Sequence, residues 1–350
     1  MNSTKTITVN ASKSYDILVG KNLITDLGEI FIKRFDKCKV AIITDDIVDK
    51  LYSAVVERTL LEKGFSVVKF VFNNGEKSKN FDTYSQIVNF LSENELTRTD
   101  LVVALGGGVV GDIAGFSAST YLRGVKYVQI PTTLLSQIDS SVGGKTAIDL
   151  EAGKNLVGAF CQPELVVCDV QLLCSLDQKV LEDGFGEGAK YALLDKKVFD
   201  LIKDKDFSMQ EFVYLCIDYK RQIVEADEFE KGNRKLLNLG HTIAHAIEKL
   251  SSFNLSHGKA VAIGLDFVLD SAFGKGRITK EQYEQIKSVL LNITKSVDKS
   301  LCPFSKKQIC ECAVFDKKRS GDYISVVNFY GVGDCRIEKI KIDNLLGQFI

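Results

Sequence analysis

A glycine turn at the end of an unbroken apolar run constrains this chain more than any other feature. Residues 101–105 are all apolar and lead directly into Gly106, the pattern of a strand buried on both faces of a parallel sheet. Gly106, Gly108 and Gly111 then have the Gly-x-Gly-x-x-Gly spacing that lets a pyrophosphate approach a helix N-terminus. The spacing alone leaves two interpretations open: a dinucleotide-binding turn, or a glycine-rich turn between a strand and a helix.

Strand and helix patterns alternate on both sides of this turn. The runs that predict strands, the first two as an antiparallel hairpin, are residues 7–9, 15–19, 39–44, 66–72, 127–130 and 165–167. Helical spacing lies between them at residues 48–63 and 84–94. This order predicts an α/β, Rossmann-like N-terminal domain with a parallel sheet. Asp45 directly follows a predicted strand, where a carboxylate can accept a hydrogen bond from a ribose, although it precedes the glycine turn.

The length of the chain predicts two domains. Its 350 residues exceed the usual size of a single domain. Strand patterns fade beyond about residue 180, and helical spacing dominates from there on. We therefore expect a Rossmann-like domain over residues 1–180 and a mainly α-helical domain over residues 181–350, with the boundary within residues 177–183.

Composition excludes several classes of protein. A net charge of −1 argues against a nucleic-acid-binding groove, and no run approaches the roughly 20 apolar residues of a membrane helix. The first ten residues contain no apolar signal core, so a cytoplasmic protein without a membrane partner is expected. The nine cysteines include no Cys-x-x-Cys pair, which indicates reduced thiols and not a disulfide framework or a cysteine zinc site.

Small polar residues and glycines dominate residues 131–145, and the same chemistry returns at residues 153–155. The ammonium groups of Lys145 and Lys154 lie close in sequence to several hydroxyls and glycines. A phosphate or a polyhydroxyl compound would suit such a segment. The alternative interpretation is a solvated loop with incidental lysines.

All three histidines fall within residues 241–257. His241 and His245 are four residues apart, which places them on one face of a helix, and this spacing alone predicts both as metal ligands. Glu187 could complete a site with three protein ligands and an open position, as a catalytic metal requires. The spacing does not identify the third ligand.

Taken together, these motifs resemble those of the 3-dehydroquinate synthases, a family of the sugar-phosphate cyclase superfamily. The motifs are residues 106–112, 121–124, 131–135, 139–145, 153–155, 234–242 and 256–258. The resemblance spans most of the chain, but the last thirty residues match poorly and the surroundings of Glu187 are unusually rich in glycine. It implies an active site in the cleft between the two domains, NAD, a divalent metal that is zinc or alternatively cobalt, and a homodimer.

The resemblance also implies roles for particular residues. The metal ligands would be Glu187, His241 and His257, which leaves His245 to face the substrate phosphate, and Arg123 would reach in from a neighbouring subunit. The implied substrate-binding and catalytic residues are Arg123, Asp139, Lys145, Asn155, Lys190, Lys220, Arg234, Asn238, His245 and one of Lys317 and Lys318. The implied NAD-binding residues are Asp45, Glu76, Lys79, Gly107, Gly108, Val109, Asp112, Thr132, Thr133, Asp139, Lys145, Lys154 and Ser175.

The activity implied is a phosphate-eliminating lyase reaction of the shikimate pathway of aromatic amino acid biosynthesis. It converts 3-deoxy-D-arabino-heptulosonate 7-phosphate to 3-dehydroquinate and phosphate by transient oxidation with NAD, phosphate elimination, re-reduction and intramolecular aldol closure. Three alternatives share parts of this pattern: a sister cyclase of the deoxy-inosose or valiolone type, a metal-dependent polyol dehydrogenase, and a non-enzymatic NAD-binding regulator. A polyol dehydrogenase has no use for the phosphate-binding set, and an intact metal triad speaks against a regulator.

Overall fold

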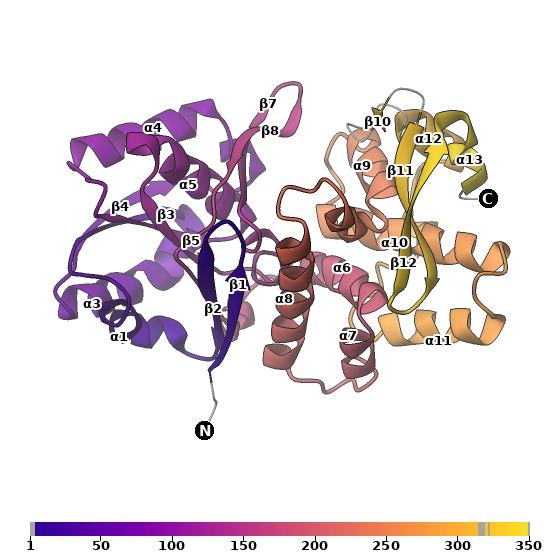
Figure 1. Ribbon diagram of the computed structural model, residues 1–350, viewed down its shortest axis with the longest axis horizontal. Coiled ribbons are helices and arrows are strands. Elements are labelled where there is room, and N and C mark those ends of the chain that lie inside the picture. Colours follow the sequence, from indigo (N-terminus) through magenta and orange to yellow (C-terminus); the bar gives the residue numbers. More distant parts are fainter. Residues whose placement is uncertain (1–3, 314–318, 321–322, 349–350) are drawn as a thin grey trace. The chain divides into compact units, whose positions relative to one another are not determined.

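The computed structural model describes residues 4–313, 319–320 and 323–348 of the chain. It contains two compact units, Met1–Leu176 and Asp177–Ile350 (Figure 1). The boundary thus lies at the N-terminal end of the region in which the sequence patterns change.

A seven-stranded sheet forms the centre of the first unit, with the strand order β1-β2-β9-β6-β5-β3-β4. The strands are β1 (Lys5–Asn10), β2 (Ser14–Gly20), β3 (Lys39–Asp45), β4 (Ser66–Phe72), β5 (Leu101–Gly106), β6 (Lys126–Pro131) and β9 (Leu165–Asp169). The β1–β2 pair is antiparallel and the other pairs are parallel. The predicted Rossmann-like sheet and its N-terminal hairpin are therefore confirmed.

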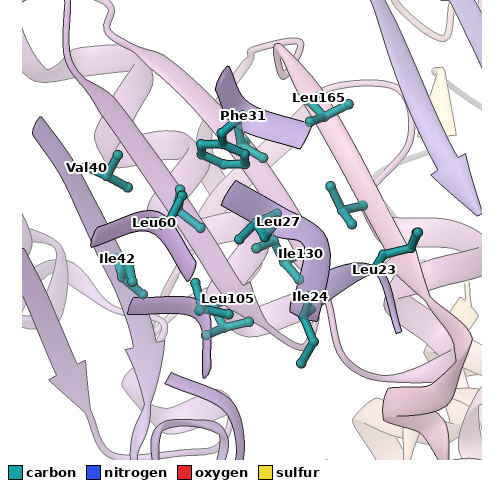
Figure 2. Packing of buried hydrophobic residues seen from close by; sticks show 14 of the residues in the cluster. Leu23, Ile24, Leu27, Phe31, Val40, Ile42, Leu60, Leu105, Ile130 and Leu165 are labelled. Atoms are coloured by element: carbon teal, nitrogen blue, oxygen red, sulfur yellow. The ribbon is translucent and has the colours of Figure 1, made fainter. Parts of the chain in front are cut away.

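Helices cover both faces of this sheet, which explains why its strands read as continuous apolar runs. On one face α1 (Leu27–Ile32) and α3 (Ala54–Glu62) pack through Leu27 and Leu60 against Ile42 and Leu105 (Figure 2). On the other face α4 (Phe81–Glu93) and α5 (Gly108–Thr120) complete a second apolar cluster. The short α2 (Asp46–Val48) and a π-helix (Asp49–Ser53) precede α3.

The polar segment after β6 is more ordered than a solvated loop. A π-helix (Ser136–Ser140) is followed by a separate hairpin of β7 (Lys145–Leu150) and β8 (Gly153–Phe160). Ser136, Gln137 and Ile138 are buried, as are Thr146 and Ile148 of β7. Part of this stretch therefore belongs to the buried interior of the unit, unlike a solvated loop.

The second unit is mainly helical, as predicted. Its helices are α6 (Gln178–Leu194), α7 (Lys196–Leu201), α8 (Met209–Ala226), α9 (His241–Leu250), α10 (His257–Gly274), α11 (Lys280–Leu290), α12 (Lys306–Ala313) and α13 (Leu345–Gln348). A 3₁₀ helix (Asn233–Asn238) leads into α9.

This unit also contains a small antiparallel sheet that the sequence reading missed. Its strands are β10 (Arg319–Ser320), β11 (Tyr323–Gly331) and β12 (Asp334–Lys341). Ile324, Val326 and Asn328 are buried, whereas Tyr323 is exposed, so β11 does have the alternation of a strand with one buried face. The signal was present, but it lay in a region dominated by helical patterns.

Candidate functional site

The carboxyl ends of the parallel strands gather the residues assigned to NAD in the first unit. In the strand order, β3 and β5 are neighbours. After β3 the chain continues to β4 on one side of this pair, and after β5 it continues to β6 on the other side. This reversal is the topological switch point at which open α/β sheets bind ligands. Asp45 ends β3 and Gly106 ends β5, and their strands are in register at Thr44 and Leu105.

The other residues assigned to the cofactor in this unit lie in the segments that follow these strands. Glu76 and Lys79 follow β4; Gly107, Gly108, Val109 and Asp112 follow β5; Thr132, Thr133 and Asp139 follow β6; Lys145 and Lys154 belong to the β7–β8 hairpin; and Ser175 ends the 3₁₀ helix (Val170–Ser175) after β9. These positions are spread over more than a hundred residues of sequence, and all but Lys145 and Lys154 end a parallel strand or lie in the segment that follows one.

Asp45 acts as the N-cap of α2. Its Oδ1 accepts hydrogen bonds from the backbone N–H of Ile47 at 3.0 Å and of Val48 at 2.9 Å. Burial raises the pKa of this carboxyl group, against the opposing effect of these two hydrogen bonds. The cap fixes the carboxylate at the end of β3.

The glycine turn leaves room for a ligand at the N-terminus of α5. Gly107 is its N-cap and provides no capping side chain, and the first turn of α5 has no acidic residue. A Cβ on Gly106 would lie 2.4 Å from Cγ2 of Val110, and one on Gly107 would lie 3.1 Å from Cγ2 of Thr133. Nearby, the buried hydroxyl of Thr132 has no hydrogen-bond partner among the described residues. Free helical N–H groups and an orphaned hydroxyl fit a bound pyrophosphate.

Lys79 is the centre of a buried polar cluster in the same unit. Its Nζ lies 2.6 Å from Oδ2 of Asp112 and 2.5 Å from Oδ1 of Asn155, and the side chain is only 4% exposed. Burial alone would lower the pKa of Lys79, but Asp112 and Glu76 outweigh it and raise the pKa. The lysine is therefore charged and joins a residue assigned to NAD to one assigned to the substrate phosphate.

Backbone hydrogen bonds fasten the hairpin to this cluster. The N–H of Asp149 donates to the carbonyl of Lys79 at 2.8 Å, and Oδ1 of Asp149 accepts from the N–H of Asn155 at 2.7 Å. Asn155 has a φ of 55°, in the left-handed region, and Nζ of Lys154 lies 3.7 Å from Oε1 of Glu76. The hairpin thus holds Lys154 and Asn155 against the segment after β4.

A group of possible metal ligands lies in the second unit. It consists of Glu187 on α6, His241 at the start of α9 and His257 at the start of α10, and their ligand atoms all lie within 4.8 Å of one another. Oε1 of Glu187 is 3.2 Å from Nε2 of His241 and 3.0 Å from Nε2 of His257. Two imidazoles and one carboxylate suit zinc and other divalent transition metals.

Glycines bring the three helices together, which explains the glycine-rich surroundings of Glu187. A Cβ on Gly186 would lie 2.0 Å from the carbonyl oxygen of Gly258, and a Cβ on Gly258 would lie 1.7 Å from that of Asp183. A Cβ on Gly264 would lie 2.3 Å from the carbonyl oxygen of Gly240, which precedes His241. These contacts allow α6 and α9 to approach α10 closely enough for the three side chains to meet.

The remaining nitrogen of each histidine in this group has its own acceptor. Nδ1 of His241 lies 3.1 Å from the carbonyl oxygen of Leu239, and Nδ1 of His257 lies 3.2 Å from Oε2 of Glu248. A proton held on Nδ1 by such an acceptor leaves Nε2 as the nitrogen that can bind a metal once it is deprotonated. Both rings are therefore oriented to coordinate a metal beside Glu187.

Electrostatics in the group are strongly perturbed. Burial alone would raise the pKa of Glu187, but Lys190 and His241 hold it well below its usual value, and Nζ of Lys190 lies 2.5 Å from Oε2 of Glu187. Burial lowers the pKa of His241 to about 4. Burial acts the same way on His257, but hydrogen bonds to Glu187 and Glu248 raise its pKa to about 10. A metal bound here would displace the proton on His257.

His245 lies beside this group but is not part of it. Its ring centroid is 5.5 Å from that of His241 and 6.3 Å from that of His257. The helical spacing correctly put His241 and His245 on one helix, but it could not reveal that His257, from another helix, approaches Glu187 more closely. The ligand set implied by the resemblance is the one that these contacts bring together.

Other residues assigned to the substrate surround a loop before α9. Arg234 and Lys220 are buried, and Nη1 of Arg234 donates to the carbonyl of Glu228. Nδ2 of Asn238 donates to Oε1 of Glu230 at 2.9 Å. Lys317 and Lys318 lie outside the described residues. Arg123 is exposed at the end of the 3₁₀ helix (Tyr121–Arg123) that follows α5, and it has a φ of 66°.

Sequence reasoning missed three acidic residues that organise this site. Asp227 accepts hydrogen bonds from the N–H groups of Lys231, Gly232 and Arg234. Oε1 of Glu230 accepts a hydrogen bond from Asn238, and Oε2 of Glu248 lies 3.2 Å from Nδ1 of His257. A signal for Glu248 existed, because it lies seven residues after His241 and therefore on the same face of a helix.

No helix in the described part of the chain combines the length and apolarity needed to cross a membrane.

Solved structures with the same fold include a valiolone synthase and a deoxy-inosose synthase. A 2-epi-5-epi-valiolone synthase from Streptomyces hygroscopicus, solved with NAD⁺ and Zn²⁺, is 24% identical with a TM-score of 0.84, and the match covers 98% of this chain and 97% of that one. A 2-deoxy-scyllo-inosose synthase, solved with carbaglucose-6-phosphate, NAD⁺ and Co²⁺, is 23% identical with a TM-score of 0.85, and the match covers 99% of both chains. These similarities confirm the fold class.

Sequence comparisons are more specific. The family model described as 3-dehydroquinate synthase N-terminal matches residues 69–183, and the one described as 3-dehydroquinate synthase C-terminal matches residues 184–319. The 3-dehydroquinate synthase of Clostridium kluyveri is 40% identical over 98% of both chains. That of Clostridium acetobutylicum is 43% identical over 94% of both chains. The chain belongs to the 3-dehydroquinate synthase family.

Proposed function

We propose that this protein is an NAD- and metal-dependent 3-dehydroquinate synthase, which converts 3-deoxy-D-arabino-heptulosonate 7-phosphate to 3-dehydroquinate and phosphate. The observation that carries the proposal is the convergence of Glu187, His241 and His257, in a chain whose glycine turn follows β5 at the switch point of the sheet. Two relatives that bear the name of this activity align with nearly the full length of the chain.

The two cofactors would occupy different units. Glu187, His241 and His257 would hold a divalent metal, with zinc as the first candidate because the solved valiolone synthase contains it. The residues at the carboxyl edge of the sheet, from Asp45 to Ser175, would hold NAD. When bound, NAD accepts and returns a hydride and the metal acts as a Lewis acid at vicinal hydroxyls.

The residues of the chain itself would bind and orient the substrate. Lys145, Asn155, His245 and Arg123 would hold the phosphate, where their charges and hydrogen bonds stabilise the negative charge that grows as it leaves. A second set would hold the carboxylate and hydroxyls of the substrate: Lys190, Lys220, Arg234 and Asn238. The substrate's own phosphate is the best-placed base for the proton lost with it. Holding one conformation throughout is the main contribution of this site.

Phosphate release tests the proposal directly. The protein, supplied with zinc and NAD, should release phosphate from the heptulosonate phosphate and form an equal amount of 3-dehydroquinate. A chelator should abolish both while the far-UV circular dichroism is unchanged, because the proposed metal is catalytic and not structural. Full activity in protein verified to be metal-free would contradict the metal assignment. Turnover of a glucose phosphate instead of the heptulosonate would indicate a sister cyclase.

A further inference from the structure

Glu248 is a buried carboxylate whose position matches no role assigned so far. It lies on α9 and is 5% exposed, and its Oε2 is 3.2 Å from Nδ1 of His257, on the opposite side of the ring from Glu187. Burying a carboxylate costs several kcal/mol unless it is paired or hydrogen-bonded. Its contact with His257 is therefore a specific one.

The two histidines of the metal group are oriented in different ways. Nδ1 of His241 faces the backbone carbonyl of Leu239, a neutral acceptor two residues away in sequence. Nδ1 of His257 faces a charged side chain from another helix. A carboxylate acceptor polarises an imidazole more than a carbonyl does and makes its other nitrogen a stronger donor to a metal. On the side of the ring that faces away from Glu187, His257 thus meets a carboxylate, whereas His241 meets a backbone carbonyl.

Helix α9 connects these contacts. His241 is its first residue, and Glu248 lies seven residues later on the same face. The helix thereby supplies one candidate ligand directly and orients another that belongs to α10. A shift of α9 relative to α10 would disturb both.

We propose that Glu248 is a positioning residue of the metal centre. It accepts a hydrogen bond from Nδ1 of His257, fixes the ring with Nε2 toward Glu187, and strengthens the bond from Nε2 to the metal. The inference rests on the proposed metal-dependent function. It assigns to Glu248 control of metal affinity and not contact with the substrate.

Metal affinity measured by competition with a chromophoric chelator tests this role. Glu248→Ala should weaken zinc binding about 10- to 100-fold and accelerate zinc loss to a chelator. Glu248→Gln keeps an acceptor oxygen but removes the charge, so its affinity should lie between those of Glu248→Ala and the unaltered protein. The same order should appear in the visible spectrum of the cobalt form, as a change in band position or intensity that a purely structural defect in folded protein would not produce.

Asp266→Asn provides a matched control. Asp266 is also a buried carboxylate of this unit, and it pairs with Lys287 and not with a histidine. Its substitution should leave the zinc affinity of the folded protein unchanged. If Glu248→Ala does not fold, the zinc affinities of Glu248→Gln and Asp266→Asn are compared instead, and weaker binding by Glu248→Gln alone supports the positioning role.

The two ways of failing are distinct. If the unaltered protein binds no divalent metal, the proposed function and this inference both fall. If it binds zinc, and both Glu248 variants bind zinc as tightly and show the unaltered cobalt spectrum, Glu248 has no positioning role, while the proposed function stands.

Discussion

At the scale of single residues, two neighbouring histidines of the second unit are expected to have different roles. Nε2 of His257 lies 3.0 Å from Oε1 of Glu187, whereas the ring centroid of His245 lies 6.3 Å from that of His257. His257→Ala should therefore weaken metal binding by more than about 100-fold, beyond the range for residues that only orient a ligand. His245→Ala should retain the metal, and its KM for the phosphorylated substrate should rise about tenfold, since it would lose a charge-assisted hydrogen bond.

Metal content measured on both purified variants checks this prediction, with kinetics on His245→Ala. Loss of metal from His245→Ala and retention by His257→Ala would restore the ligand pair that helical spacing alone predicts.

Asp227 provides a pH-dependent prediction at the same scale. Burial alone would raise the pKa of its carboxyl group, but the N–H groups of Arg234, Gly232 and Lys231 lower it. A lowered pKa in the folded state stabilises the fold above the unfolded pKa of about 4, and this contribution is lost as the pH falls toward the folded value. Asp227→Asn should thus reduce the free energy of unfolding at pH 7 by about 1 kcal/mol or less, because solvent screens the carboxylate and Asn keeps an acceptor oxygen. The difference from the unaltered protein should shrink below about pH 4 in urea titrations.

Sequence reasoning reached part of the site at this scale, for physical reasons. The clustering of all three histidines indicated a metal site, because chance rarely gathers them. Choosing among them required knowledge of which helices meet, and residue spacing within one helix cannot supply it. From the sequence alone Glu187 could be named only as a residue that could complete the site, and the family resemblance made it a ligand. Asp227 and Glu230 could not be found because their partners are backbone groups or side chains that the loop brings together.

At the scale of elements, small residues determine how closely the helices approach. Gly186→Ala would place a Cβ 2.0 Å from the backbone oxygen of Gly258, which cannot move without displacing α10. We expect a loss of about 2 kcal/mol or more in unfolding free energy, together with weaker zinc binding, because Glu187 and His257 would be pushed apart.

Gly274→Ala is the control for this prediction. It lies at the end of α10, and a Cβ there would meet nothing within 4 Å. Since alanine favours a helix more than glycine does, the substitution should be neutral or slightly stabilising. Equal stability of Gly186→Ala and Gly274→Ala in urea titrations would show that the glycine contact does not limit helix packing.

The elements themselves were predictable to different degrees. Strands buried on both faces, such as β3 and β5, were found because their apolar runs are continuous and end in turn residues. The β7–β8 hairpin was missed because β8 is partly exposed along its length and β7 begins with small and polar residues. The alternation in β11 was overlooked among helical patterns. Strands with one exposed face give weaker sequence signals than buried ones.

At the scale of the whole molecule, the family resemblance implies that Arg123 completes the site of a second copy of the chain. Leu122, Arg123 and Gly124 all have positive φ values, of 50°, 66° and 119°, and Leu122 is 39% exposed. Strained backbone at an exposed position is typical of functional segments. Mixed dimers of inactive Arg123→Ala and inactive His257→Ala protomers should therefore regain activity at one of their two sites. No activity in verified mixed dimers would place Arg123 in the site of its own subunit or outside the site.

The use of NAD distinguishes this function from that of a dehydrogenase on the same fold. The heptulosonate phosphate and the combined products, 3-dehydroquinate and phosphate, stand at the same oxidation level, so any hydride removed must return to the same molecule. A trace of NAD should therefore support many equivalents of phosphate release without a matching rise in absorbance at the wavelength of reduced nicotinamide. An analogue with a non-cleavable phosphonate should leave at most NADH that remains bound to the protein.

The residues that would hold NAD and those that would hold the phosphate are linked by hydrogen bonds and ion pairs. Asn155 is fixed by Asp149 and Lys79, and Lys79 also pairs with Asp112 beside the glycine turn. Lys79→Met should thus weaken the binding of both NAD and phosphate. If the two sites are independent, the substitution should weaken only the binding of NAD. The measurements are NAD affinity by fluorescence titration and phosphate affinity by competition.

NADH that accumulates in solution in proportion to the natural substrate would contradict the cyclase function, because a returned hydride leaves no net reduction.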